Sequence, residues 1–208
     1  MEGFEVIERI KERNQSQGEF VTMAIRFLEP TCVKFTGTVD LKKGSMVSVD
    51  GSDVIFNGKP AGKVLKILSG DDVRVDTSYD IKYTGGYSLD GKTMYLDEHF
   101  PPLMEVEGNQ VDSRKSIGLH HELPEKWLAD EKYEYPYAHE VATGIEKKYV
   151  ESLGVTWQGY CRVVDSNLRR VYSRTLEKSP PSLDLAPYLY CRDREALNEI
   201  RNSEDTSN

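Results

Sequence analysis

Hydrophobic and polar residues alternate with a period of two over about residues 19–99. β-Branched and aromatic residues recur at every second position, and Gly, Asn-Gly or Asp-Gly breaks interrupt the pattern, as is typical of strands joined by tight turns. The stretches are FVTMAIRFL, CVKFTGTVDL, MVSVDG, DVIFNGKPAGKVLKIL, DVRVDTSYDIKY and KTMYLDEHF. The run VSVDGSDVIFNGKPAGKVLKI predicts two successive hairpins. We therefore expect a small antiparallel sheet or barrel.

The pattern becomes helical on both sides of this region. Phe4, Ile7 and Ile10 are spaced as on one helix face, which predicts a short amphipathic helix over residues 3–15, ending before QSQGE. After Pro101-Pro102 the hydrophobic spacing predicts helices over residues 114–132, 137–153, 157–178 and 193–202. Gly154 is placed to end the second of these.

Prolines and polar residues dominate the end of the chain. The segment SPPSLDLAPYLYCRD predicts an extended stretch, since proline disfavours a helix interior, and NSEDTSN is a polar tail. The predicted fold class is α+β. A β-rich module with a short N-terminal helix takes residues 1–88, and a strand plus helical domain with a Pro-rich extended tail takes residues 89–208.

The composition is that of a globular protein, with 38% hydrophobic and 30% charged residues. A net charge of −8 disfavours nucleic acid as a partner, since nucleic-acid binding needs a basic surface. No run approaches the roughly 18 apolar residues of a membrane span, and the first residues are too charged for a signal peptide. We expect a cytoplasmic protein. Cys32, Cys161 and Cys191 are far apart, which predicts reduced structural thiols.

All four histidines lie between residues 99 and 139, in a window rich in Asp and Glu. Imidazole and carboxylate groups together are the ligand set of zinc and neighbouring divalent metals. Within the window, HELPE (residues 121–125) matches the HExxH helix of zinc peptidases with glutamate in place of the second histidine. The clustering therefore predicts a metal site.

Helix geometry assigns a role to each residue of this motif. His121 and Glu125 are four residues apart and share a helix face, so both can bind one ion, while Glu122 lies about 100° round the helix, where a base would take a proton from bound water. His139, on the next helix, is the predicted third ligand. Glu146 is about 10.5 Å further along that helix. We therefore place it against a ligand or the substrate.

Two features leave alternatives open. Pro124 lies inside the motif, so the helix either begins near His121 or is kinked there. The region is also crowded with aromatic side chains, which serve either in core packing or, for one tyrosine, in donating a hydrogen bond to a developing oxyanion. These are Trp127, Tyr133, Tyr135, Tyr137, Tyr149, Trp157 and Tyr160.

Residues 90–190 resemble a largely uncharacterised protein family of bacterial genomes and prophages. The motifs that carry the resemblance read DGKTMYLDEHFP, HELPE, YPYAHEVATGIE, YVESLGVTWQGY and SPPSLDLAPY, and cover about half the chain. Family members more often have an aliphatic residue at the position of Pro124. The resemblance implies that His121, Glu122, Glu125 and His139 form one constellation, and it implies no established reaction. The family's repeated polar residues are Asp97, His121, Glu122, Glu125, His139, Thr143 and Glu146.

The order of elements is similar to that of zincin-like (gluzincin-like) metallopeptidases: a strand over 91–98, the HExxE helix, then a second ligand helix. By this analogy the strand would bind an extended substrate along its edge. The first hypothesis is a zinc-dependent, or other divalent-metal-dependent, hydrolase of the peptidase type. His121, Glu125 and His139 would hold the ion, Glu122 would activate water, and Asp97, Thr143 and Glu146 would contact a ligand or the substrate.

The second hypothesis belongs to another class of protein. It is a non-enzymatic, phage-related structural or interaction protein, a component of a phage assembly, with a structural metal or a buried His/Glu network. An open coordination position facing a cleft would favour the hydrolase, and a closed or metal-free site would favour the interaction protein. Nucleic-acid cleavage at a metal centre is a third hypothesis, disfavoured by the acidic charge.

Overall fold

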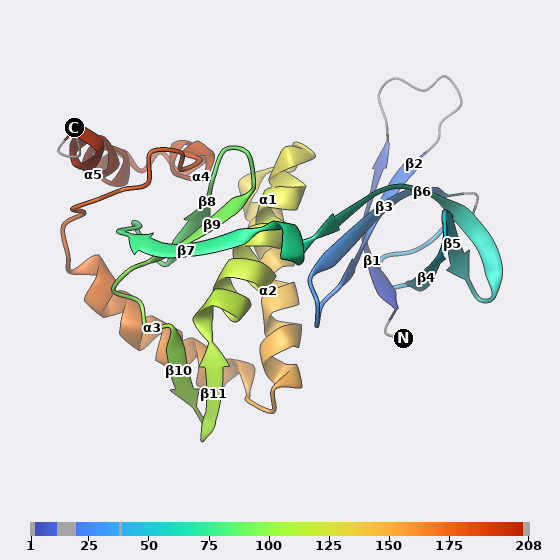
Figure 1. Ribbon diagram of the computed structural model, residues 1–208, viewed down its shortest axis with the longest axis horizontal. Coiled ribbons are helices and arrows are strands. Elements are labelled where there is room, and N and C mark those ends of the chain that lie inside the picture. The colour runs from blue at the N-terminus through green and yellow to red at the C-terminus, as the bar shows by residue number, and fades with distance from the viewer. Residues whose placement is uncertain (1–2, 12–19, 38, 206–208) are drawn as a thin grey trace. The chain divides into compact units, whose positions relative to one another are not determined.

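The computed structural model describes residues 3–11, 20–37 and 39–205 (Figure 1). They belong to two compact units, Met1–Asp72 and Val73–Asn208. The first unit is an antiparallel six-stranded β-barrel, and the second carries the helices. The predicted α+β fold class is confirmed, whereas the two units divide after Asp72 and not after residue 88.

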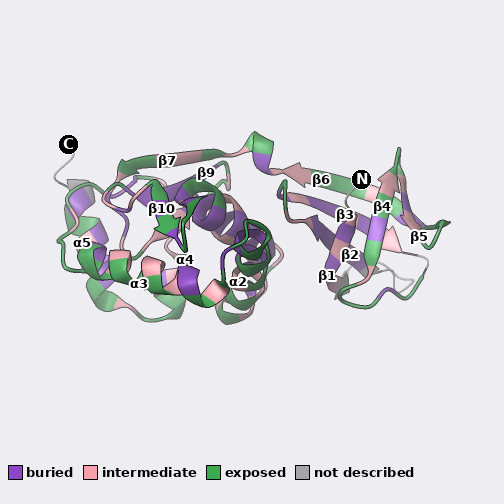
Figure 2. Ribbon diagram, turned by 90° about the horizontal axis from the view of Figure 1, so that it is seen from below, coloured by how far each residue is buried: buried purple, intermediate pink, exposed green. Residues whose placement is uncertain are grey.

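The barrel is closed in the strand order β1-β2-β3-β6-β5-β4. Pairing of Phe4 with Val47, between β1 and β4, completes the ring. Phe4, Val6, Val33, Phe35 and other buried side chains fill its interior (Figure 2). The predicted successive hairpins are β4-β5 and β5-β6. The strands are β1 Phe4–Lys11, β2 Phe20–Arg26, β3 Thr31–Gly37, β4 Met46–Asp50, β5 Asp53–Phe56 and β6 Lys59–Ser69, followed by the 3₁₀ turn η1 Gly70–Asp72.

The helix predicted over residues 3–15 is wrong where the structure describes that segment, because Phe4–Lys11 form β1. Phe4 and Val6 point into the barrel with the alternation of a strand, and the pairing with β2 then shifts between Val6 and Glu8. The extra residue of such a bulge also buries Ile7. Hydrophobic residues at positions 4 and 7 thus imitate helical spacing. The predicted helix end before QSQGE lies outside the described residues.

The second unit begins with a three-stranded sheet in the order β7-β9-β8, where β7 runs parallel and β8 antiparallel to β9. The two strands before residue 88 therefore pair with β9 and not with the barrel, which is why the predicted boundary was too late. Because β9 is the central strand, it cannot receive a substrate along its edge, and that expectation is wrong. The strands are β7 Arg74–Tyr79, β8 Gly85–Tyr87 and β9 Thr93–Asp97, followed by the hairpin of β10 Leu103–Val106 and β11 Asn109–Asp112.

The helix with the HELPE motif has two hydrogen-bond registers. Arg114–Glu122 form a π-helix, η2, which continues directly into α1, Leu123–Asp130. The Leu123 N–H bonds the Gly118 carbonyl, five residues back, just before Pro124 enters the first turn of α1. The dihedral angles of Glu122 and Leu123 are helical. The wider π turn thus accommodates Pro124 without interrupting the helix.

The remaining helices cover the site and close the second unit. Gly154, with φ +81°, follows the end of α2 as predicted. The segment predicted as extended contains α4, because Pro187 falls in its first turn, where a missing N–H is tolerated. None of the described helices is long and apolar enough to cross a membrane. They are α2 Tyr135–Ser152, α3 Trp157–Tyr172, α4 Ala186–Tyr190 and α5 Arg194–Asp205.

Candidate metal centre

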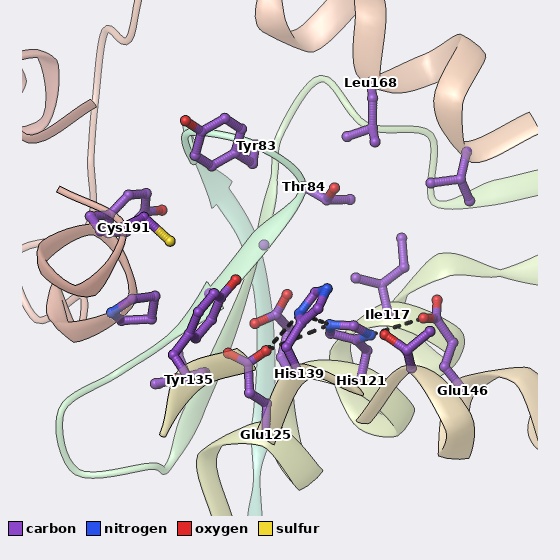
Figure 3. A pocket seen from close by; sticks show the side chains of 18 of the residues that line it. Tyr83, Thr84, Ile117, His121, Glu125, Tyr135, His139, Glu146, Leu168 and Cys191 are labelled. Carbon is purple, nitrogen blue, oxygen red and sulfur yellow. Dashed lines mark hydrogen bonds and ion pairs between the residues drawn. The ribbon is translucent and has the colours of Figure 1, made fainter. Parts of the chain in front are cut away.

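His121, Glu122 and Glu125 of the HELPE motif line a cavity of about 500 Å³ in the second unit (Figure 3). Side chains from η2, α1 and α2 form the polar part of its wall, β8 forms another wall, and α3 contributes apolar side chains. No lysine or arginine of the described residues lines it, whereas six carboxylate side chains do. These are Glu122, Glu125, Glu146, Asp165, Asp184 and Asp193. Such a cavity attracts cations and repels phosphate groups.

The three predicted metal ligands meet at one point of this cavity. His121 Nε2 lies 3.1 Å from His139 Nδ1, which lies 2.9 Å from Glu125 Oε2. The third side of the triangle, from His121 Nε2 to Glu125 Oε2, is 3.7 Å. His121 and Glu125 are brought together by the helical turn between them, and α2 supplies His139. The spacing argument and the structure therefore agree on which three side chains converge.

This triangle has the dimensions of a zinc site. Zinc binds histidine nitrogen and carboxylate oxygen at about 2.0–2.2 Å, and tetrahedral geometry then separates neighbouring ligand atoms by about 3.3–3.5 Å. The measured sides of 2.9, 3.1 and 3.7 Å bracket that separation. Glu125 is buried, while the His139 side chain is 48% exposed. The donor set fits a divalent ion that keeps one position facing the cavity.

Glu146 holds His121 from the other side. His121 Nδ1 lies 2.9 Å from Glu146 Oε2, so a neutral His121 that donates through Nδ1 directs the Nε2 lone pair at the metal position. The Tyr160 hydroxyl donates to Glu146 Oε1 at 2.6 Å and lies 3.0 Å from Ser116 Oγ. Burial and the charge of Glu146 raise the pKa of Tyr160 well above its ordinary value, so it remains a donor. Thr143 also lines the cavity.

Two residues of the β8 segment complete the site and were missed in the sequence. Tyr87 lines the cavity with Glu125, and its burial, together with the charges of Glu125 and Glu122, raises its pKa. Gly85 lies against Glu122, since a Cβ atom at Gly85 would be 2.9 Å from Glu122 Oε1. Both residues precede the predicted domain boundary at 88. The sheet pairing of β8 with β9 brings them to the site.

The buried Glu122 is an unusually weak acid. Burial and the negative charge of Glu125 raise its pKa to about 8, opposed in part by His121. Burial lowers the pKa of His121, but the hydrogen bond and charge of Glu146, with Glu122 and Glu125, outweigh it and raise that pKa to about 9. Without an ion, protons on these side chains therefore balance the clustered carboxylates.

Three residues that the sequence predicted or that cluster with the site residues in the sequence do not line the cavity: Asp97, His99 and His120. Asp97 does not line the cavity; it accepts the backbone N–H groups of Ile81 and His99. His99 approaches Asp80, whose other oxygen accepts the Glu177 N–H, so this second acidic cluster joins chain segments. His120 is buried, with its ring stacked at 3.7 Å on Tyr149. Only two of the four clustered histidines belong to the site.

Replacing Tyr160 by phenylalanine tests the support of Glu146. We expect Tyr160→Phe to lower zinc affinity about 10-fold and the free energy of unfolding by about 1.5–3 kcal/mol, because the buried carboxylate loses its 2.6 Å donor. Competition with a chromophoric chelator and urea unfolding measure the two effects. Tyr149→Phe is the control, since Tyr149 is also buried but does not line the cavity. Equal effects of both substitutions would contradict the role of Tyr160.

The comparisons with known proteins give no match: no protein-family model, curated protein or solved structure is similar to this chain. The arguments about function therefore rest on the geometry of the site.

Proposed function

We propose that the protein is a zinc-dependent hydrolase that cleaves peptide bonds. The observation that supports this most directly is the triangle of His121, Glu125 and His139 donor atoms at the edge of an accessible cavity. Zinc at such a site lowers the pKa of a bound water to near 7. Glu146 supports the arrangement, since a neutral His121 that donates to it through Nδ1 would leave Nε2 available to the ion.

Glu122 acts as the general base in this proposal. It is buried beside the metal ligands and lines the cavity, and its ionised carboxylate would accept a proton from water and return it to the leaving amine. The C–O bond would form first and give a tetrahedral oxyanion, and the C–N bond would then break as the amine is protonated; water supplies both the hydroxyl group and the proton. The Tyr135 hydroxyl lines the same cavity and is the proposed hydrogen-bond donor to the oxyanion.

A second candidate function rests on a different feature of the same residues. His121, Glu146, His139 and Glu125 already form a connected hydrogen-bond network. Such a network also suits a non-enzymatic interaction protein, and the resemblance to prophage proteins suggests a cytoplasmic phage assembly as its setting. The 48% exposure of the His139 side chain and the adjoining cavity favour the hydrolase.

Metal content tests the proposal. We expect the purified protein to hold about one zinc ion per chain by elemental mass spectrometry, and the His121→Ala/His139→Ala double variant to hold none, because two of three ligands are lost. Glu140→Ala is the matched control, since Glu140 is exposed on the same helix as His139 and does not line the cavity. A wild-type protein that takes up no zinc from micromolar solution, with unchanged circular dichroism, would contradict the hydrolase and favour the interaction protein.

A further inference from the structure

The cavity has two walls beyond the metal ligands that bear on its substrate. The first lies on the side of Ile117 and Leu168, which are above His121 in the view of Figure 3. On the first side, α3 and η2 form what we call the apolar chamber. It consists of Ile117, Trp157, Cys161, Val164 and Leu168. A chamber of this kind accommodates a bulky apolar group next to the reacting bond.

The second wall is the free edge of β8. Thr84 and Ser88 exchange backbone hydrogen bonds with β9 through the Thr84 carbonyl and the Ser88 N–H. In an antiparallel pair these groups alternate, so the N–H and C=O of Gly85 face away from β9. Further along, residues 182–184 cover the edge by bonding Tyr87 and Leu89. Among the described residues, the backbone of this edge that is left without such a partner is therefore a short stretch around Gly85.

The position of this edge links it to the chemistry. Gly85 is in van der Waals contact with the catalytic region, since a Cβ atom there would meet Glu122 Oε1 at 2.9 Å and the Tyr95 carbonyl at 2.9 Å. Gly85 and Glu122 line the same cavity, so an extended chain paired with this backbone would run within that cavity. One N–H and one C=O provide main-chain recognition that does not depend on side-chain identity.

Charge restricts the substrate further. No described lysine or arginine lines the cavity, so neither a phosphate nor a terminal carboxylate finds a cationic partner there. The chamber itself offers apolar surface from Ile117, Val164 and Leu168. An interior segment of a peptide chain, without a terminal carboxylate or acidic side chains, satisfies both conditions.

We propose that the substrate is an interior peptide segment that pairs with the β8 edge at Gly85 and places a bulky apolar side chain in the apolar chamber. This inference rests on the proposed function for the cleavage step, but the binding step stands without it. The protein is then an endopeptidase selective for large aliphatic or aromatic residues beside the cleaved bond.

The test uses end-blocked neutral peptides that differ at one central position, carrying Leu, Phe, Ala, Asp or Lys. We expect the zinc-loaded protein to cleave the Leu or Phe peptides at least about 10-fold faster, in kcat/KM, than the Asp peptide. Leu168→Phe narrows the chamber and is expected to shift preference towards Ala by roughly 10-fold. Ser166→Phe is the matched control, because Ser166 is exposed on the same helix and does not line the cavity.

A binding measurement separates the two proposals. Trp157 lies in the chamber, so the Leu peptide is expected to change tryptophan fluorescence in the wild type but not in Trp157→Phe or Leu168→Phe. Cleavage with a preference that Leu168→Phe leaves unchanged would overturn the chamber and leave the hydrolase standing. Fluorescence changes without cleavage would support peptide recognition and contradict the hydrolase. If the Leu and Asp peptides behave alike in both measurements, the inference is wrong.

Discussion

Glu122→Gln is expected to lower kcat/KM for a cleaved Leu peptide by about 10²–10⁴-fold while zinc binding is retained. Glutamine has nearly the same shape as glutamate, and Glu122 is not one of the three residues whose donor atoms form the triangle. The glutamine of the variant, however, cannot accept a proton. A loss of kcat at constant zinc content would therefore identify Glu122 as the base, since the variant keeps the ion and loses only proton transfer.

The measurement combines steady-state hydrolysis of an internally quenched neutral peptide with elemental analysis of the same samples. Glu140→Gln is the matched control, because Glu140 is exposed on α2 and does not line the cavity. Full activity of Glu122→Gln would contradict the assignment of the base. Loss of zinc together with activity would show instead that Glu122 is a ligand, and the roles of Glu122 and Glu125 would have to be exchanged.

The alternating pattern of residues 19–99 was sufficient to predict strands, because side-chain alternation is a local property of strands. It could not show which strands pair. The sequences of β7 and β8 show the same alternation as the barrel strands before them, yet both strands pair with β9 in the second unit. The same limit explains the N-terminal error, since the bulge after Val6 arises from pairing with β2. Local patterns thus predicted element type better than domain membership.

The residues of the site likewise fall into those that local sequence patterns predict and those that reach the site only through tertiary pairing. His121 and Glu125 could be predicted to converge because one helical turn separates them, and His139 because a short connection returns α2 beside η2. Tyr87 and Gly85 carry no sequence motif and reach the site only through the pairing of β8 with β9. Asp97, carried over by the resemblance, was expected to contact a ligand or the substrate and instead binds backbone N–H groups. The π turn that accommodates Pro124 within the helix also has no recognisable sequence pattern.

The metal-free protein is expected to lose stability as pH rises from about 6 to 9. Glu122 has a folded pKa of about 8 against an ordinary value of 4.5, so the folded state keeps a proton that the unfolded state releases, and stability falls between those pH values. His121 has a folded pKa of about 9 against 6.5, and its contribution is full below 6.5 and lost as pH rises through 9. Because the two groups interact, their effects overlap, and we expect a total loss on the order of 3 kcal/mol.

Zinc is expected to reverse this trend, because it replaces the proton on His121 and neutralises the carboxylates. The stabilisation by zinc should therefore grow from pH 6 to pH 9, measured as the urea midpoint with and without a chelator. Glu122→Gln should be more stable than the wild type in the metal-free state at pH 8 and should show a shallower dependence between pH 4.5 and 8, since glutamine does not titrate. A metal-free wild type whose stability is flat or rises over this range would contradict the raised pKa values. In that case the Glu122 carboxylate, which the proposed reaction needs, would not destabilise the metal-free folded state.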